Sequence, residues 1–182
     1  MELSEQDRSR LVEWARAAVE SEVCGRTPPA PGDLEGALAE RRGCFVTLTN
    51  AGRLRGCIGT FQPQEPLGRQ IVEMGAAAAR DPRFTMNPIT SAELGEIDVE
   101  VSVLSPLAKT ERPEELRPGV DGAYIVRGTR AGCFLPEVAT QMGWGAEEFL
   151  DQCCTGKAGL APGAWRDPGT DVYLFTSEKF GE

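Results

Sequence analysis

The chain of 182 residues contains no histidine. Histidine is the commonest general base, a frequent ligand of zinc and iron, and the usual partner of serine and cysteine nucleophiles. Its absence excludes Ser/His and Cys/His nucleophile pairs and every histidine-ligated metal site. A general base in this protein must therefore be a carboxylate or a lysine.

Long apolar runs and paired cysteine motifs are also missing. No segment approaches the ~20 apolar residues that cross a bilayer, and the polar N-terminal segment lacks the apolar core of a signal peptide. We therefore expect a cytoplasmic protein that does not enter a membrane. The six cysteines form no Cys-x-x-Cys motif, so in a reducing compartment we expect free thiols.

The sequence predicts neither a metal site nor a cofactor. Only cysteine and carboxylate side chains are available as strong ligands. Cys153 and Cys154 are adjacent in a predicted helix, where neighbouring side chains diverge by about 100° and do not share a ligand.

Positive charge is scarce, with 19 lysines and arginines against 28 acidic residues and a formal net charge of -9. A phosphate backbone requires a broad positive field, so we expect no nucleic-acid partner. The acidic excess is strongest in residues 93–121, which we interpret as a solvated face. The proportions of hydrophobic residues (41%) and charged residues (26%) suit a globular chain with one substantial core.

Hydrophobic periodicity predicts an α+β fold. Apolar positions from Leu11 to Val23 recur at helical spacing behind a capping Ser4, and a second helix begins at Pro66 and ends before Asp81. The other predicted elements are strands at 44–49, 54–61, 97–103, 123–127, 132–135 and 172–175, and helices at 136–142 and 146–154.

The first two strands are predicted to form a hairpin. Asn50-Ala51-Gly52 would be a three-residue loop with Gly52 in the left-handed conformation, and Thr49 would pair with Arg53. Since side chains alternate along a strand, this register divides the hairpin into two faces. A candidate site face carries Phe45, Thr47, Arg55 and Cys57, and a core face carries Cys44, Val46, Leu54 and Ile58.

Cys57 is the leading candidate for a catalytic residue, since glycines bracket it and Arg55 is expected on the same face. A neighbouring cation stabilises a thiolate, and without histidine the acid/base candidate is Glu100. The alternative is that Cys57 is a small, tightly packed thiol, because free cysteines are among the most buried residues.

Three cations, Arg55, Arg83 and Lys157, are predicted to converge on an anionic ligand, since arginine suits bidentate recognition of carboxylates and phosphates. The alternative is that each serves a structural ion pair, with Glu100 as the natural partner of Arg55. Three further residues of the hairpin are predicted to line the ligand site: Thr47, Gly56 and Gly59.

Several motifs together resemble the AMMECR domain family, and most closely the bacterial branch called AmmeMemoRadiSam system protein A. The most specific is LRGCIGT, residues 54–60. The others are DPRF (81–84), VEVSVLSP (99–106), VDG (120–122), LPEV (135–138), GW (143–144), FL (149–150), KAGL (157–160) and Trp165. The resemblance covers nearly the whole chain.

This resemblance implies two subdomains. The larger would be built from both chain ends, about residues 1–117 and 165–182, around an antiparallel sheet with flanking helices. The smaller would be an α+β subdomain at about residues 118–164, with the LRGCIGT stretch expected at the interface between the two.

The resemblance also implies association with a Memo-like protein, which resembles metal-dependent dioxygenases, and with a radical SAM enzyme. Two hypotheses for function stay open. The chain is either an enzyme or enzyme component that binds a small anionic ligand in a cleft centred on Cys57 and Arg55, or a non-catalytic adaptor that docks those two partners. The absence of histidine is easier to explain for an adaptor.

Overall fold

The computed structural model describes residues 2–182, which divide by their contacts into two units. The first unit runs to Leu104 and takes up Glu178–Glu182 at the end of the chain, and the second is Ser105–Ser177. Each unit has its own four-stranded antiparallel sheet and its own buried core. The predicted α+β class is therefore confirmed.

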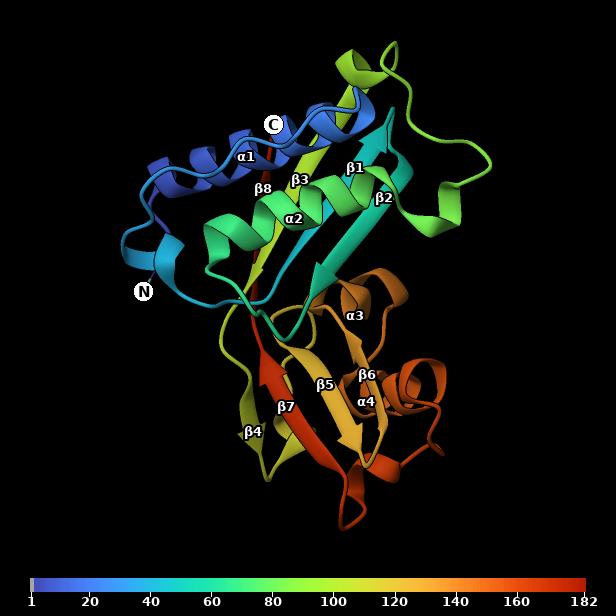
Figure 1. Ribbon diagram of the computed structural model, residues 1–182. Coiled ribbons are helices and arrows are strands. Elements are labelled where there is room, and N and C mark those ends of the chain that lie inside the picture. Colours follow the sequence, from blue (N-terminus) through green and yellow to red (C-terminus); the bar gives the residue numbers. More distant parts are fainter. Residues whose placement is uncertain (1) are drawn as a thin grey trace. The chain divides into compact units, whose positions relative to one another are not determined.

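The first sheet has the strand order β2-β1-β3-β8, and helices α1 and α2 pack on one of its faces (Figure 1). Ser4 caps α1 through a capping box with Asp7, which satisfies backbone N–H groups at the helix start. The elements of this unit are α1 (Glu5–Val23), β1 (Cys44–Asn50), β2 (Arg53–Thr60), α2 (Leu67–Ala79), β3 (Ile97–Leu104) and β8 (Ser177–Gly181), with 3-10 turns at Gly36–Ala39, Pro82–Phe84 and Leu94–Glu96. Within residues 2–182 no helix has the length and apolarity that crossing a bilayer demands.

The β1–β2 hairpin differs from its predicted register. The loop is the two residues Ala51-Gly52, both with positive φ, so Asn50 pairs with Arg53. The left-handed conformation predicted for Gly52 is confirmed at φ 75°.

A bulge lies further along the same hairpin. Thr49 pairs with Leu54, whereas Leu48 pairs with Gly56, so Arg55 is the extra residue on β2. The two-residue loop places Leu54 opposite Thr49, so Leu54 shares the face of Thr49 and is 42% exposed. Its predicted place on the core face is wrong, while Ile58 does pack against the core.

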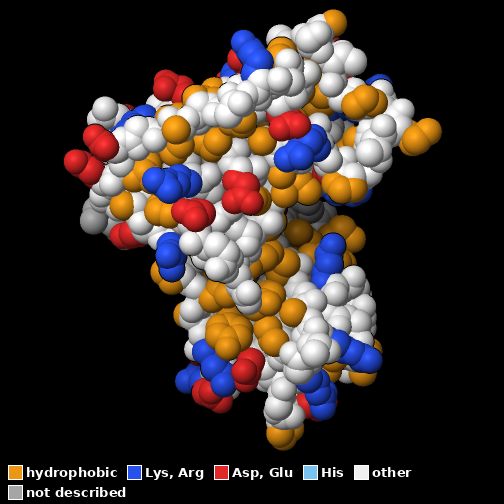
Figure 2. Space-filling model, in the orientation of Figure 1, with side chains coloured by type: hydrophobic (Ala, Val, Ile, Leu, Met, Phe, Trp, Pro, Cys, Tyr) orange, Lys and Arg blue, Asp and Glu red, His pale blue; other side chains and the backbone are white. Residues whose placement is uncertain are grey.

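The second sheet has the strand order β4-β7-β5-β6 and packs around the buried Phe149. Figure 2 shows hydrophobic side chains gathered over β5 and β7. Tyr124 and Tyr173 are cross-strand neighbours there, with ring centroids 6.2 Å apart. The elements are β4 (Ala108–Thr110), β5 (Gly122–Arg127), β6 (Arg130–Phe134), α3 (Pro136–Met142), α4 (Ala146–Cys153) and β7 (Asp171–Phe175), with 3-10 turns at Pro113–Glu115 and Ala164–Arg166 and a π-helical turn at Cys154–Ala158.

The boundaries between the two units lie at 104/105 and 177/178, whereas the expected subdomain boundaries are 117/118 and 164/165. Strands β4 and β7 pair within the second sheet, so they lie in the second unit rather than with the chain ends. The sequence pattern predicts neither β4 nor β8. Both are short, and their residues alternate too weakly to stand out as strands.

Gly56 allows α2 to approach β2 closely. A Cβ atom on this residue would lie 2.1 Å from the carbonyl oxygen of Ala78, inside the van der Waals limit against a helix backbone. The contact fixes the C-terminal end of α2 against the sheet. The first glycine of LRGCIGT therefore has a packing role.

We expect Gly56→Ala to destabilise the protein by at least about 2 kcal/mol, because backbone would have to move against backbone. The measurement is the free energy of unfolding in urea. Gly95→Ala is the matched control, since a Cβ there meets no atom within 4 Å and φ is not positive. Equal effects of the two substitutions would contradict the packing role.

Candidate functional site

Cys57 lies in a row of three side chains that crosses the first sheet. Thr47 on β1 is the direct cross-strand neighbour of both Cys57 on β2 and Glu100 on β3. Since Val46 and Leu48 point toward the helices, this row lies on the opposite face. The predicted residues Thr47, Cys57 and Glu100 are therefore brought together.

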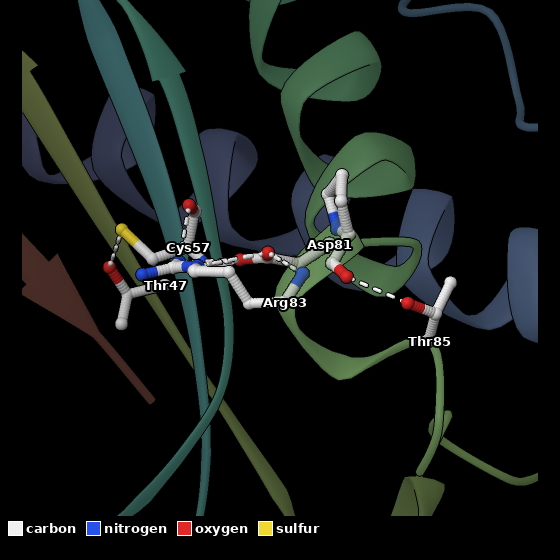
Figure 3. Close-up of polar contacts among 6 residues, drawn as sticks. Thr47, Cys57, Asp81, Arg83 and Thr85 are labelled. Carbon is white, nitrogen blue, oxygen red and sulfur yellow. Dashed lines mark hydrogen bonds and ion pairs between the residues drawn. The ribbon is translucent and has the colours of Figure 1, made fainter.

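The Cys57 thiol is half-buried and contacts Thr47 directly. The Thr47 hydroxyl donates a hydrogen bond to Cys57 Sγ over 3.3 Å (Figure 3). A hydroxyl can either donate to a sulfur or accept from a thiol, so Thr47 suits both protonation states.

Asp81 and Arg83 cover the open edge of β2 at Cys57. The Cys57 N–H donates to Asp81 Oδ2 over 2.9 Å, and Arg83 Nη2 donates to the Cys57 carbonyl over 3.1 Å. Because β2 is an edge strand, these two backbone groups have no neighbouring strand to bond. The two side chains take the place of that strand (Figure 3).

Among the groups around Cys57, Asp81 has the most strongly shifted pKa. The side chain is buried, and the Arg83 guanidinium donates to both of its carboxylate oxygens. Those bonds, with help from the backbone N–H groups of Cys57 and Arg83, hold the pKa of Asp81 well below its ordinary value, although burial acts in the opposite direction. Asp81 is therefore a carboxylate across the physiological range.

Arg55 is committed to a different partner from the one predicted. Its guanidinium forms a bidentate pair with Glu93, at 2.6 and 3.0 Å, and also donates to the carbonyls of Asn87 and Pro88. The hydrogen bonds from Arg55 lower the pKa of Glu93. Pairing of Arg55 with Glu100 is wrong, since Glu100 pairs with Lys179 at 3.1 Å.

The other predicted ligand-binding residues have contacts of their own. A Cβ atom on Gly59 would lie 2.2 Å from the Phe45 ring, so this glycine makes room for an aromatic side chain. Lys157 belongs to the second unit, where its ammonium lies 5.3 Å from the centroid of the Phe134 ring. The role of these residues in ligand binding stays a prediction.

The remaining thiols differ from Cys57 in their surroundings. Cys24 is exposed, whereas Cys44 is buried and burial raises the pKa of its thiol to about 12. Burial also raises the pKa of Cys133 to about 11 and that of Cys153. The thiols of Cys44, Cys133 and Cys153 are therefore protonated at neutral pH.

The sequence predicts no site role for Asp81 or Glu93, the two carboxylates that pair with Arg83 and Arg55. The sequence pattern marks Asp81 only as the end of a helix and as part of the DPRF motif. The available signal was a carboxylate two residues before an arginine at a helix exit, which permits a local ion pair. No local pattern connects Glu93 with Arg55, because 38 residues separate them.

The comparisons with known proteins agree with the motifs. The AMMECR1 family model matches residues 12–180. The chain belongs to the AMMECR1 family. A protein of Methanothermobacter thermautotrophicus is 45% identical over 188 residues, which cover 99% of this chain and 96% of that protein. Protein TK0174 of Thermococcus kodakarensis is 45% identical over 184 residues, covering 94% and 88% of the two chains.

A solved structure of the AMMECR1 family gives the same result for the fold. The chain is similar to the crystal structure of uncharacterized protein PH0010 from Pyrococcus horikoshii, with a TM-score of 0.86 and 38% sequence identity. The match covers 99% of this chain and 93% of that one. The two-sheet α+β architecture is thus shared with an experimentally determined relative.

The low pKa of Asp81 predicts a pH-dependent contribution to stability. Between the folded pKa and the ordinary value of 3.8, the unfolded chain binds a proton that the native state does not, so stability rises with pH. The contribution is complete above about pH 5 and is lost as the pH falls toward the folded pKa. At neutral pH we expect Asp81→Asn to destabilise the protein by about 1–3 kcal/mol, since the amide cannot pair with Arg83.

Urea unfolding between about pH 6 and pH 2 measures this difference. The gap between the native protein and Asp81→Asn should shrink as the solution becomes more acidic. Asp33→Asn removes an exposed carboxylate and serves as control. A gap that stays constant with pH would show that the ion pair contributes no proton linkage.

Proposed function

We propose that this AMMECR1-family chain is an enzyme or enzyme component that binds a small anionic ligand, with the Cys57 thiol as its reactive group. The observation that carries the proposal is the hydrogen bond from Thr47 to Cys57 Sγ, in a row that also contains Glu100. A half-buried thiol with a hydroxyl donor and a carboxylate on the same sheet face has the components of a nucleophile with a proton acceptor.

Thr47 links the other two members of the row. Neighbouring strands are about 4.8 Å apart, so Cys57 and Glu100, two strands from one another, are separated by about 10 Å. That distance is too long for direct proton transfer. Thr47 lies on the strand between them, so a proton leaving the thiol would reach Glu100 by way of the Thr47 hydroxyl, turned to accept it, or of a water.

Arg83 is the cation best suited to meet the charge of the ligand. Its side chain is 57% exposed, and its Nη1 donates no hydrogen bond to any residue within 2–182. The Arg55 side chain is 11% exposed and already donates to three residues. Since Arg83 also binds the Cys57 carbonyl, its free donors lie near the thiol-bearing residue.

Alkylation with two reagents that differ only in charge tests this proposal. Iodoacetate is anionic and iodoacetamide is neutral. If Arg83 attracts an anion toward the thiol, the ratio of the iodoacetate rate to the iodoacetamide rate should be at least about threefold higher at Cys57 than at the exposed Cys24. Peptide mass spectrometry after timed quenching gives both rates in one sample.

Variants of the cation complete the test. Arg83→Gln should abolish the preference for iodoacetate, while Arg83→Lys should retain most of it because the charge remains. Thermal unfolding of both variants verifies that the comparison is made on folded protein. Equal rate ratios at Cys57 and Cys24 in the native protein would overturn the anionic site, and failure of both reagents to modify Cys57 would overturn the reactive thiol.

A second candidate function is that of an adaptor that docks a Memo-like protein and a radical SAM enzyme. The observation in its favour is an exposed apolar surface on the first unit. Met86 is 98% exposed in the segment between the Pro82–Phe84 turn and β3, and Leu54 is 42% exposed on the hairpin. Exposed large apolar side chains are typical of protein interaction sites.

The adaptor function predicts direct binding of purified partners. A Memo-like protein and a radical SAM enzyme from the same genome should co-elute with the chain in size-exclusion chromatography. Met86→Asp should weaken the complex about tenfold or more, because it places a charge in an apolar contact. Met142→Asp, at another exposed methionine, is the control. Absence of any complex with the native chain would rule out the adaptor.

A further inference from the structure

A cavity of about 530 Å³ opens beside the loop of the β1–β2 hairpin. Sites for small organic molecules typically measure about 300–1,000 Å³, so its size is suitable. It lies entirely within the first unit. Its lining residues are Asn50, Ala51, Arg53, Leu54, Arg55, Phe84, Asn87 and Glu93.

Positive charge prevails in this cavity, although the chain as a whole carries a net charge of -9. Its lining contains Arg53 and Arg55 but only one acid, Glu93. The Arg53 side chain is exposed and makes no ion pair or side-chain hydrogen bond with any residue between 2 and 182. Arg53 is therefore a cation with all of its donors available, beside an Arg55 that is already fixed in place.

The cavity also offers apolar surface of a kind that a flat ring would cover. Leu54 is exposed there because the two-residue loop pairs it with Thr49, on the face away from the helices. Phe84 is half-buried, and the Arg55 guanidinium carbon lies 6.0 Å from its ring centroid. Aromatic rings and guanidinium planes both stack on flat partners.

The hairpin loop beside the cavity contains a residue with a strained backbone conformation. Ala51 has φ 49°, which makes it the one non-glycine residue with positive φ within residues 2–182, and it lines the cavity. The left-handed conformation is unfavourable for alanine, whereas asparagine or glycine is favoured in such a hairpin loop. Strain of this kind tends to persist at ligand sites.

From these observations we propose that the cavity binds a planar organic anion, an aromatic ring that carries a phosphate or carboxylate group. The ring lies against Leu54 and Phe84, and the anionic group accepts hydrogen bonds from Arg53. Arg55 contributes its charge and a flat surface. The site goes beyond the proposed function, because it does not require Cys57 to react.

Binding of phenyl phosphate and of benzoate tests the proposal in two arms, which separate the two anionic groups. In two-dimensional amide NMR spectra, at least one of the compounds should cause saturable shifts of the Leu54 and Phe84 resonances at millimolar concentration. Inorganic phosphate and phenol, each with half of the required chemistry, should bind about tenfold more weakly or not at all. Absence of saturable shifts with both aromatic anions would overturn the site.

Two variants show where the ligand binds. Arg53→Gln should weaken binding about tenfold or more through loss of a charge-assisted hydrogen bond. Arg69→Gln makes the same change of charge on the exposed side of α2, outside the cavity, and should leave binding unchanged. Equal losses of affinity in these two variants would show that the net charge alone accounts for the effect, and this result would overturn the site.

Cys57→Ser separates this site from the proposed function. It removes the thiol and should leave the affinity for the aromatic anion within about twofold of the native value. Loss of binding in Cys57→Ser, with thermal unfolding unchanged, would contradict a site that is independent of the thiol.

Discussion

The hydrogen bonds that Asp81 and Arg83 make to the backbone of Cys57 close the free edge of β2. An edge strand normally presents unpaired N–H and C=O groups to solvent or to another chain. Here a buried carboxylate and a guanidinium from the turn after α2 satisfy both. The LRGCIGT and DPRF motifs are thus one structural unit, although 20 residues separate them in the sequence. The close approach of Ala78 to Gly56 fixes the same helix end one residue earlier along β2.

Two arginine–carboxylate pairs flank the thiol. The arginines of the two pairs differ in how far they are exposed to solvent, and we infer different roles from this difference. Arg55 and Glu93 are both largely buried, and the pair ties the hairpin to the segment before β3. Arg83 is mostly exposed even though its partner Asp81 is buried. A buried bidentate pair is costly to open, whereas an exposed guanidinium can bind a further anion with its free nitrogen. Of the two arginines, Arg83 therefore keeps a donor available, whereas all three guanidinium nitrogens of Arg55 already donate hydrogen bonds.

Local sequence patterns predicted the elements well and the tertiary contacts poorly. The capping Ser4, the proline at the start of α2 and the alternation in β3 are decided within a few residues, and the structure has all three. The partner of Arg55 is decided by where the segment before β3 returns to the hairpin, which no local pattern encodes. Similarly, the packing role of Gly56 depends on a helix carbonyl more than 20 residues away. The sequence marked Gly56 as unusual but could not say what approaches it.

The hairpin bulge connects these observations. In the register predicted without it, Thr47 would oppose Arg55 and Cys57 would oppose Phe45, so the thiol would lie beside an aromatic ring. The two-residue loop pairs Asn50 with Arg53, while packing against α2 requires Gly56 opposite Leu48. One residue must be left over, and it is Arg55. As the extra residue, Arg55 has its guanidinium free to reach Glu93, and Cys57 moves opposite Thr47. The loop itself places Leu54 opposite Thr49, beside the cavity. The thiol row thus depends on one extra residue, imposed by a tight loop at one end of the strand and a close helix contact at the other.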